Sequence, residues 1–167
     1  AQVYVDDTGT EVFAGSRTKW IAPEDDNFGF ARWVQANREE LLKLGPGSHF
    51  GEWWGSGIQR GYGLREKRFS LFNVVRWDVP TRPACCGVVP TLFRGNMDAL
   101  VGPSDDPMSG CPSLLHQLLH DLRVHGSRAV PGFMKPEGLV IYHVAAGVGF
   151  KKTLDKDDVP KSLAGAP

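Results

Sequence analysis

Several charged positions in the sequence have the residue types that bind phosphates and sugars. Glu52 lies in the aromatic run FGEWW, Glu137 stands before Gly138 at the start of an apolar run, and Lys151 and Lys152 end another. A carboxylate among bulky apolar groups must be exposed at a site, be paired, or have a raised pKa. With an aromatic side chain, these groups could line a pocket for a flat anionic ligand such as a nucleotide. The simpler interpretation, which spacing alone favours, is that each is a solvated charge at a strand edge.

The cysteines and histidines do not form a pattern typical of a metal site. Cys85 and Cys86 are adjacent and the third cysteine is Cys111, which is a poor disulfide framework and favours a reducing, cytoplasmic compartment. Adjacent cysteines rarely both reach one zinc ion. His116 and His120 have the spacing of a zinc-binding helix, but the sequence HQLLH lacks the glutamate of HExxH. We therefore expect a pair of histidines that is satisfied by other contacts or lies on the surface.

The segments that would position these residues are mostly strand-like. Runs of β-branched and aromatic residues predict strands over 2–6, 11–14, 48–54, 69–77, 87–93, 138–144 and 147–152. Apolar residues at helical spacing predict helices over 28–44, with Asp26 or Asn27 as the cap, and over 113–125. Strands outnumber helices and do not alternate regularly with them. This pattern predicts an α+β fold with antiparallel sheet and disfavours a doubly wound fold.

Composition limits the classes of protein that the chain can belong to. Its 167 residues include 19 Lys and Arg against 19 Asp and Glu, so a histone-like protein that coats polyanions is excluded. A local basic groove remains possible. No apolar run approaches the roughly 20 residues of a membrane helix, and the first residues, AQVYVDD, do not form a signal peptide. We expect a monomer without membrane contact, with one domain over 1–155 and a polar tail over 156–167.

Five short segments in order resemble the nucleotidyltransferase domain of ATP-dependent RNA ligases of the type 2 RNA ligase kind. These enzymes are relatives of DNA ligases and mRNA capping enzymes. The segments are SRTKWIAP (16–23), FGEWWGSGIQ (50–59), KRFSLFNVVRW (67–77), PEGLVIY (136–142) and GFKKTL (149–154). A lone EG or KK pair would be a weak signal, whereas five pieces in order are a strong one. The resemblance implies largely antiparallel sheets flanked by helices around a nucleotide cleft.

The resemblance implies roles for individual residues on the nucleoside side of that cleft. Arg17 would contact the phosphate side of the nucleotide or the 3′-OH end of the RNA strand. Glu52 would hold the ribose hydroxyl, and Phe72 would stack on adenine from an inward position on a strand, as suits an aromatic ring.

The resemblance also implies roles on the phosphate side. Glu137 would position a divalent metal, Mg²⁺ or Mn²⁺, or its water shell, and a carboxylate is a natural ligand for such an ion. Lys151 would contact the α-phosphate and stabilise charge in the transition state. Lys152 is a second candidate for nucleotide binding, but neighbours on a strand point to opposite faces, so we favour Lys151.

The chain departs from the family pattern at three places. Thr153 stands where the fifth motif commonly has a second lysine, and Asn73 where related ligases often have aspartate. The nucleophile of the family is a lysine in a Lys-x-Asp-Gly motif, expected a few residues before Ala1, and no lysine precedes Lys19. The covalent lysyl-AMP step needs such an amine. We therefore expect that this chain alone does not adenylylate itself.

The resemblance implies an ATP-dependent RNA ligase that joins RNA 3′-OH and 5′-phosphate ends through lysyl-AMP and adenylylated RNA. One alternative is a DNA ligase or a capping-type nucleotidyltransferase with the same fold. Another is a non-catalytic module that binds a nucleotide or RNA and never had the lysine. The basic loop at 60–68 could contact a nucleic-acid backbone, and a solvated loop explains it equally well.

Overall fold

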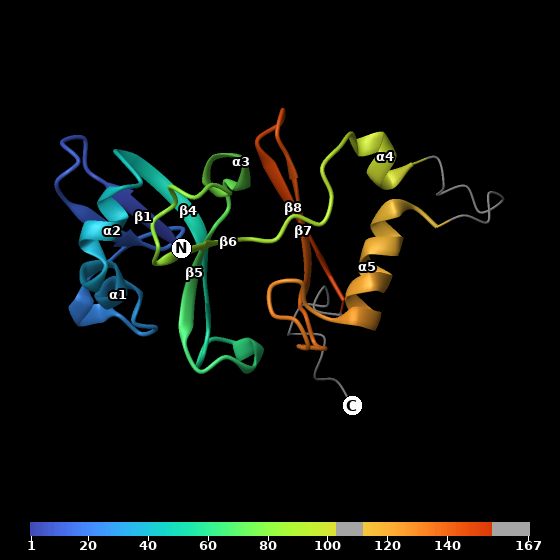
Figure 1. Ribbon diagram of the computed structural model, residues 1–167, viewed down its shortest axis with the longest axis horizontal. Helices are drawn as coiled ribbons and strands as arrows, with labels where there is room; N and C mark the ends of the chain where they lie inside the picture. Colours follow the sequence, from blue (N-terminus) through green and yellow to red (C-terminus); the bar gives the residue numbers. More distant parts are fainter. Residues whose placement is uncertain (103–111, 155–167) are drawn as a thin grey trace. The chain divides into compact units, whose positions relative to one another are not determined.

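The computed structural model describes residues 1–102 and 112–154, and it divides the chain into two compact units. Unit 1 runs from Ala1 to Thr91, and unit 2 begins at Leu92 (Figure 1). Helices are combined with mostly antiparallel strands, which confirms the expected α+β class at this level. The single domain over 1–155 stays a prediction, and the tail at 156–167 lies outside the described residues.

Unit 1 is built on a six-stranded sheet with the strand order β3-β2-β1-β4-β5-β6 (Figure 1). Neighbouring strands are antiparallel except for β5 and β6, which are parallel. The strands are β1 Gln2–Val5, β2 Val12–Gly15, β3 Trp20–Ile21, β4 Gly47–Gly55, β5 Lys67–Leu71 and β6 Cys86–Val88. The sequence predicted β1, β2 and β4 closely, but it did not predict β3.

The single helix predicted over 28–44 is wrong, because the structure has two short helices there. They are α1 Phe30–Ala36 and α2 Arg38–Leu42. The break falls at Asn37, whose φ of −111° and ψ of 19° are not helical and whose side-chain amide donates to the Trp33 carbonyl at 2.8 Å. An asparagine side chain competes for backbone groups in this way. The cap residue of α1 is Gly29 and not the predicted Asp26 or Asn27, although the Asp26 carboxylate accepts from the backbone N–H of Phe30 at 2.8 Å.

The strand predicted over 69–77 is also wrong in its second half. β5 ends at Leu71, and a short helix, α3 Val74–Trp77, follows. The side chain of Asn73 accepts a hydrogen bond from the backbone N–H of Arg76 at 3.1 Å and so caps α3. Two 3₁₀ turns, η1 Pro23–Asp25 and η2 Gly61–Gly63, complete the elements described in unit 1. β5 therefore ends at Leu71, although the Phe72 N–H still donates to the Phe50 carbonyl of β4.

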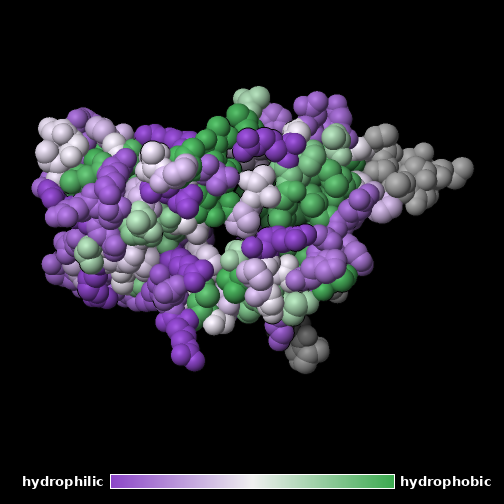
Figure 2. Space-filling view, viewed as in Figure 1, coloured by the Kyte–Doolittle hydropathy of each residue, from purple (hydrophilic) through white to green (hydrophobic). Residues whose placement is uncertain are grey.

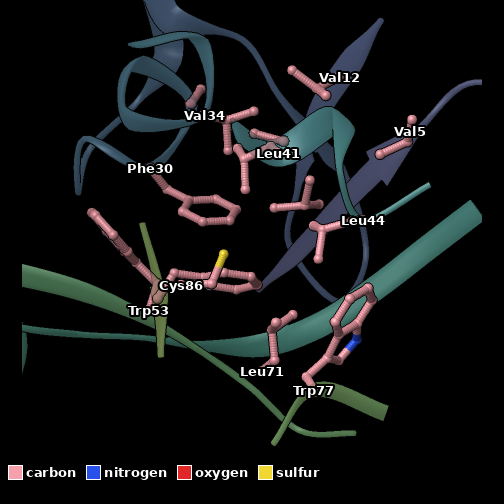
Figure 3. Close-up of a cluster of buried hydrophobic side chains, with 14 residues drawn as sticks. Val5, Val12, Phe30, Val34, Leu41, Leu44, Trp53, Leu71, Trp77 and Cys86 are labelled. Carbon is pink, nitrogen blue, oxygen red and sulfur yellow. The ribbon is translucent and has the colours of Figure 1, made fainter. Parts of the chain in front are cut away.

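The core of unit 1 lies between one face of the sheet and helices α1 and α2. Val5 and Val12 from the strands meet Phe30, Val34 and Leu41 from the helices (Figure 3). Each fully buried side chain of this kind contributes about 1.5–3 kcal/mol. Alternate strand residues point away from these helices, and we call that side of the sheet the outer face. It carries Tyr4, Phe13, Trp20, Phe50, Glu52 and Trp54, as the strand registers require.

Unit 2 combines two helices with a two-stranded antiparallel sheet (Figure 1). The elements are α4 Met97–Val101, α5 Leu114–His125, β7 Gly138–His143 and β8 Val148–Thr153. α5 confirms the predicted second helix: Ser113 caps its start by accepting from the His116 N–H, and Gly126 ends it with a φ of +79°. Hydrophobic side chains also reach the surface of this unit among hydrophilic ones (Figure 2).

None of the helices in residues 1–102 and 112–154 combines the length and the apolar character that crossing a membrane requires. The longest of them is α5, which has 12 residues.

Candidate functional site

Glu52 and Phe72 lie close together on the outer face of unit 1. Glu52 pairs with Ser70 across β4 and β5, and the Phe72 N–H donates to the Phe50 carbonyl at 3.0 Å, which continues the same register. Residues directly opposite each other share a face, and diagonal neighbours are about 7–8 Å apart. Glu52 is exposed, and Phe72 is 49% exposed on the side away from the core. The structure thus brings these two expected site residues together.

Two glycines explain why β4 and β5 can approach so closely around Glu52. A Cβ atom on Gly51 would lie 2.5 Å from the Ser70 carbonyl oxygen and 2.7 Å from the Phe69 ring. A Cβ atom on Gly55, whose φ is +112°, would lie 2.4 Å from the Glu66 carbonyl oxygen. Only glycine fits at either position. The glycines of the segment GEWWG are therefore required by strand packing.

The two tryptophans after Glu52 are anchored on opposite faces of the sheet. Trp53 points into the core, and its indole N–H donates to the Phe28 carbonyl at 3.1 Å. Trp54 is on the outer face, where its indole N–H donates to the Ser70 hydroxyl at 2.9 Å and its ring meets Tyr62 edge-on. This double anchoring fixes the strand on which the Glu52 carboxylate stands.

Arg17 lies in the turn that joins β2 to β3. The Ser16 side chain holds this turn by accepting from the N–H of Lys19 at 3.0 Å, and Lys19 forms an ion pair with Asp25 at 3.2 Å. Arg17 is exposed and has no hydrogen bond or ion pair with any residue that the structure describes. Its guanidinium group is available to an anion. It is not on β4 or β5, so the sheet does not set it directly beside Glu52.

In unit 2 the structure pairs Glu137 with Lys151. The Lys151 ammonium group lies 2.5 Å from the Glu137 carboxylate. The register of the hairpin sets Lys151 opposite Val140 and Lys152 opposite Leu139, so the two lysines are on opposite faces, as strand alternation predicts. Lys151 is the one that meets the carboxylate.

Gly138 permits the close approach of β7 and β8 beside this ion pair. Its φ is +152°, and a Cβ atom there would lie 2.1 Å from the Lys152 carbonyl oxygen. Only glycine is compatible with both features. The glycine after Glu137 is therefore a structural requirement of the hairpin.

The chemistry available differs between the two units. In unit 1, an exposed aromatic ring beside a carboxylate can stack on a flat ring and accept hydrogen bonds from hydroxyl groups. In unit 2, Lys151 can bind a phosphate oxygen, and Glu137 would then be released to bind a cation. No group of three or more metal-ligating side chains occurs among the residues described. A single carboxylate fits an Mg²⁺ or Mn²⁺ ion whose other ligands are water and phosphate oxygens.

The structure gives local contacts for one of the two helix histidines and for two of the cysteines. The His116 ring nitrogen Nδ1 is 2.8 Å from the Ser113 hydroxyl at the start of α5. The free thiols of Cys85 and Cys86 lie 3.8 Å apart. Cys111 is outside the described residues.

Sequence reasoning missed the aromatic residues that share the outer face with Glu52. Phe50 is 56% exposed on β4, and Tyr4, Phe13 and Trp20 form a cluster on β1, β2 and β3. The alternation of Val3 and Val5 with Tyr4 was a signal that could have revealed part of this face.

Comparisons with protein-family models, with curated proteins and with solved structures found no match to this chain. Its function is therefore argued from its own residues.

Proposed function

We propose that this chain belongs to an ATP-dependent RNA ligase that joins 3′-OH and 5′-phosphate ends. The observation that carries the proposal is the placement of Glu52 and Phe72. Two residues from separate motifs of the resemblance lie as diagonal neighbours on one exposed face. An aromatic ring beside a carboxylate is the minimum needed to hold a nucleoside by its base and ribose.

In the proposed mechanism, residues of unit 1 bind a nucleoside and residues of unit 2 bind phosphate. Phe72 stacks on adenine, and Glu52 accepts hydrogen bonds from the ribose hydroxyls. Lys151 would contact the α-phosphate, and Glu137 would hold a hydrated Mg²⁺ or Mn²⁺ ion, which would supply further neutralisation of phosphate charge. Such charge neutralisation is the main protein contribution to phosphoryl-type transfer.

The proposal places the nucleophilic lysine upstream of Ala1. The amine would attack the α-phosphorus and lose a proton while the bond to the β-phosphate breaks and pyrophosphate leaves. The AMP would then pass to the RNA 5′-phosphate, and the 3′-OH of the second strand would displace it. Ala1 pairs with Gly51 through hydrogen bonds of 2.8 and 3.0 Å. If this pairing continues, the preceding residue lies opposite Glu52, so an upstream segment would approach the proposed site.

The decisive experiment uses the protein extended upstream along its reading frame. Incubation with α-labelled ATP and Mg²⁺ should leave AMP covalently bound, and RNA with 3′-OH and 5′-phosphate ends should be joined. Glu137→Ala and Lys151→Ala should each greatly reduce joining. Lys152→Ala is the matched control, because the same charge is lost from the opposite face of β8. Full joining activity in both Glu137→Ala and Lys151→Ala would show that the assigned site is wrong.

The 167-residue chain by itself gives a second test. It should bind ATP weakly at most and take no covalent label, since no lysine precedes Lys19. A labelled band from this chain would contradict the assignment of the nucleophile to an upstream segment.

A second candidate function is a non-catalytic module that binds a nucleotide or RNA. It is considered because no lysine precedes Lys19 in this chain. The reading frame upstream of Ala1 separates the two: a Lys-x-Asp-Gly motif there supports the ligase. If the complete gene lacks it, the binding module is favoured. A DNA ligase would instead seal nicked DNA, and a capping enzyme would transfer GMP.

A further inference from the structure

Three aromatic side chains form an exposed cluster on the outer face of β1, β2 and β3. The ring centroids are 6.2 Å apart for Tyr4 and Phe13, 5.8 Å for Tyr4 and Trp20, and 6.4 Å for Phe13 and Trp20. Trp20 is 60% exposed and Phe13 is 49% exposed. We call these three residues the aromatic cluster.

The cluster is not needed to complete the core of unit 1. The residues between its members, such as Val3 and Val12, point to the other face of the sheet and are buried there. A glycine on the neighbouring strand nevertheless makes room for one ring of the cluster. Trp20 pairs with Gly15, and a Cβ atom on Gly15 would lie 3.2 Å from two atoms of the indole ring. A residue larger than glycine would push the indole away from β2.

Charged groups of both signs lie beside the cluster, and the Tyr4 hydroxyl donates to the Asp7 carboxylate at 3.4 Å. Arg17 and Lys19 lie in the turn directly before Trp20; Lys19 pairs with Asp25 at 3.2 Å, so Arg17 is the cation that an anionic occupant would meet. On the neighbouring strands of the same face, the Gln2 side-chain amide donates to the Ser48 hydroxyl at 2.8 Å.

Single-stranded nucleic acid has the matching chemistry. Proteins that bind it offer aromatic side chains on a sheet face for base stacking, with Lys and Arg beside them for the phosphates.

We propose that the aromatic cluster binds the bases of a single-stranded segment of RNA, and that Arg17 contacts its phosphates. The inference deepens the proposed function and rests on it for the choice of RNA. The outer face runs across four strand spacings from Phe72, after β5, to Trp20 on β3. That is about 19 Å, since neighbouring strands are about 4.8 Å apart. This distance is several times the step of about 3.4 Å between stacked nucleotides, so the strand can extend beyond one bound nucleotide.

The test measures binding of a fluorescein-labelled, single-stranded 12-nucleotide RNA to the full chain by anisotropy, without ATP. Trp20→Ala and Phe13→Ala should each raise the Kd by about 5- to 150-fold, the range expected for loss of one base–aromatic stack. Trp20→Phe, which keeps a ring, should recover most of the affinity. Phe28→Ala is the matched control, because Phe28 is 54% exposed but precedes α1 and lies off the sheet. Circular dichroism checks that each variant is folded.

Several results would overturn the inference. One is that the parent chain does not bind the RNA, and another is that Trp20→Ala and Phe13→Ala bind it as well as the parent does. A third is that these variants abolish self-association of the parent in sedimentation, which would make the face an interface between copies of the chain.

Failure of the proposed function would look different. The extended protein would then take no covalent AMP, while Trp20→Ala would still weaken RNA binding. Conversely, the extended protein could form covalent AMP while Trp20→Ala leaves RNA binding unchanged. That result would support the ligase function and contradict RNA binding at the aromatic cluster.

Discussion

Gly138 shows how a single residue can decide the geometry beside a charged pair. A Cβ atom at this position would lie 2.1 Å from the Lys152 carbonyl oxygen and 2.8 Å from the Thr153 Cα. Both contacts are with backbone, which cannot rotate away. Because Glu137 precedes this glycine and Lys151 lies on the facing strand, a side chain here would separate the ion pair as well as the strands.

Gly138→Ala is expected to lower the free energy of unfolding by more than about 1 kcal/mol, since its φ of +152° and the backbone contacts both exclude alanine. Gly149→Ala, in the same hairpin, is the matched control: its nearest atom would be Val140 Cγ1 at 4.0 Å. Urea unfolding of both variants measures the difference. Equal losses of stability in the two variants would contradict the close approach at Gly138.

The adjacent thiols differ in burial and in the direction in which their pKa values are shifted. Cys85 is half-buried, and its pKa is lowered chiefly by a hydrogen bond from Cys86, with Lys43 also contributing. Cys86 is 5% exposed, and the same contact and its burial raise its pKa. Thiolates are the reactive species. In a Cys111→Ser background, iodoacetamide should therefore modify Cys85 first, as peptide mass spectrometry can follow. Faster labelling of Cys86 in the folded protein would reverse the assignment.

At the scale of elements, β4 depends on a buried histidine on its core face. His49 is 4% exposed, its ring nitrogen Nε2 lies 2.8 Å from the Gly45 carbonyl oxygen, and its ring packs edge-on against Trp77. Burial lowers the pKa of His49, the bond to Gly45 opposes that change, and the positive charge of Arg76 adds to it. The neutral ring is thus the form that the fold prefers.

The lowered pKa of His49 predicts a loss of stability in mild acid. The unfolded chain takes up a proton at the ordinary histidine pKa of about 6.5, whereas the folded chain does so only at lower pH. The contribution is therefore complete above about pH 6.5 and is lost as the pH falls toward the folded pKa. Urea unfolding between pH 7.5 and 5 should show His49→Phe changing less with pH than the parent does. Parallel pH profiles for the two proteins would rule this out.

The elements that the sequence predicted are those with strong local signals. The alternation of Val3, Tyr4 and Val5 predicted β1, and Ser113 with Gly126 bounded α5. The break at Asn37 and the turn into α3 at Asn73 depend on side-chain hydrogen bonds to nearby backbone, and a hydrophobic pattern does not contain them. β3 has two residues and exists because it pairs with β2.

The candidate site could be predicted as residue types but not as an arrangement. The aromatic flanks of Glu52 and the pairs EG and KK were visible in the sequence. That Phe72 lies diagonally from Glu52 follows from the register of β4 and β5, which two separate segments set through Gly51 and Phe69. The exposed position of Phe72 also differs from the inward position expected on a strand, because Phe72 alternates with the buried Leu71 and so faces away from the core.

For the whole molecule, the balance of charge makes any nucleic-acid binding depend on a few local cations. The 19 basic and 19 acidic residues cancel, so the chain has no overall attraction for a polyanion. The slope of log K against log salt for RNA binding therefore reports how many phosphate contacts the binding face makes. Each phosphate contact on a single strand contributes about 0.7 to the slope of log K against log salt.

Arg17→Ala should reduce the magnitude of that slope by about 0.7, because one phosphate contact is lost while base stacking on the aromatic cluster remains. Arg38→Ala is the matched control, since it removes the same charge from the molecule but Arg38 already pairs with Glu11 at 3.2 Å. Anisotropy titrations of the labelled RNA at several salt concentrations measure both slopes. If the two variants change the slope equally, net charge governs binding and Arg17 is no phosphate contact. If only Arg17→Ala changes the slope, Arg17 itself contacts a phosphate. A protein without net charge can bind RNA only through such local contacts.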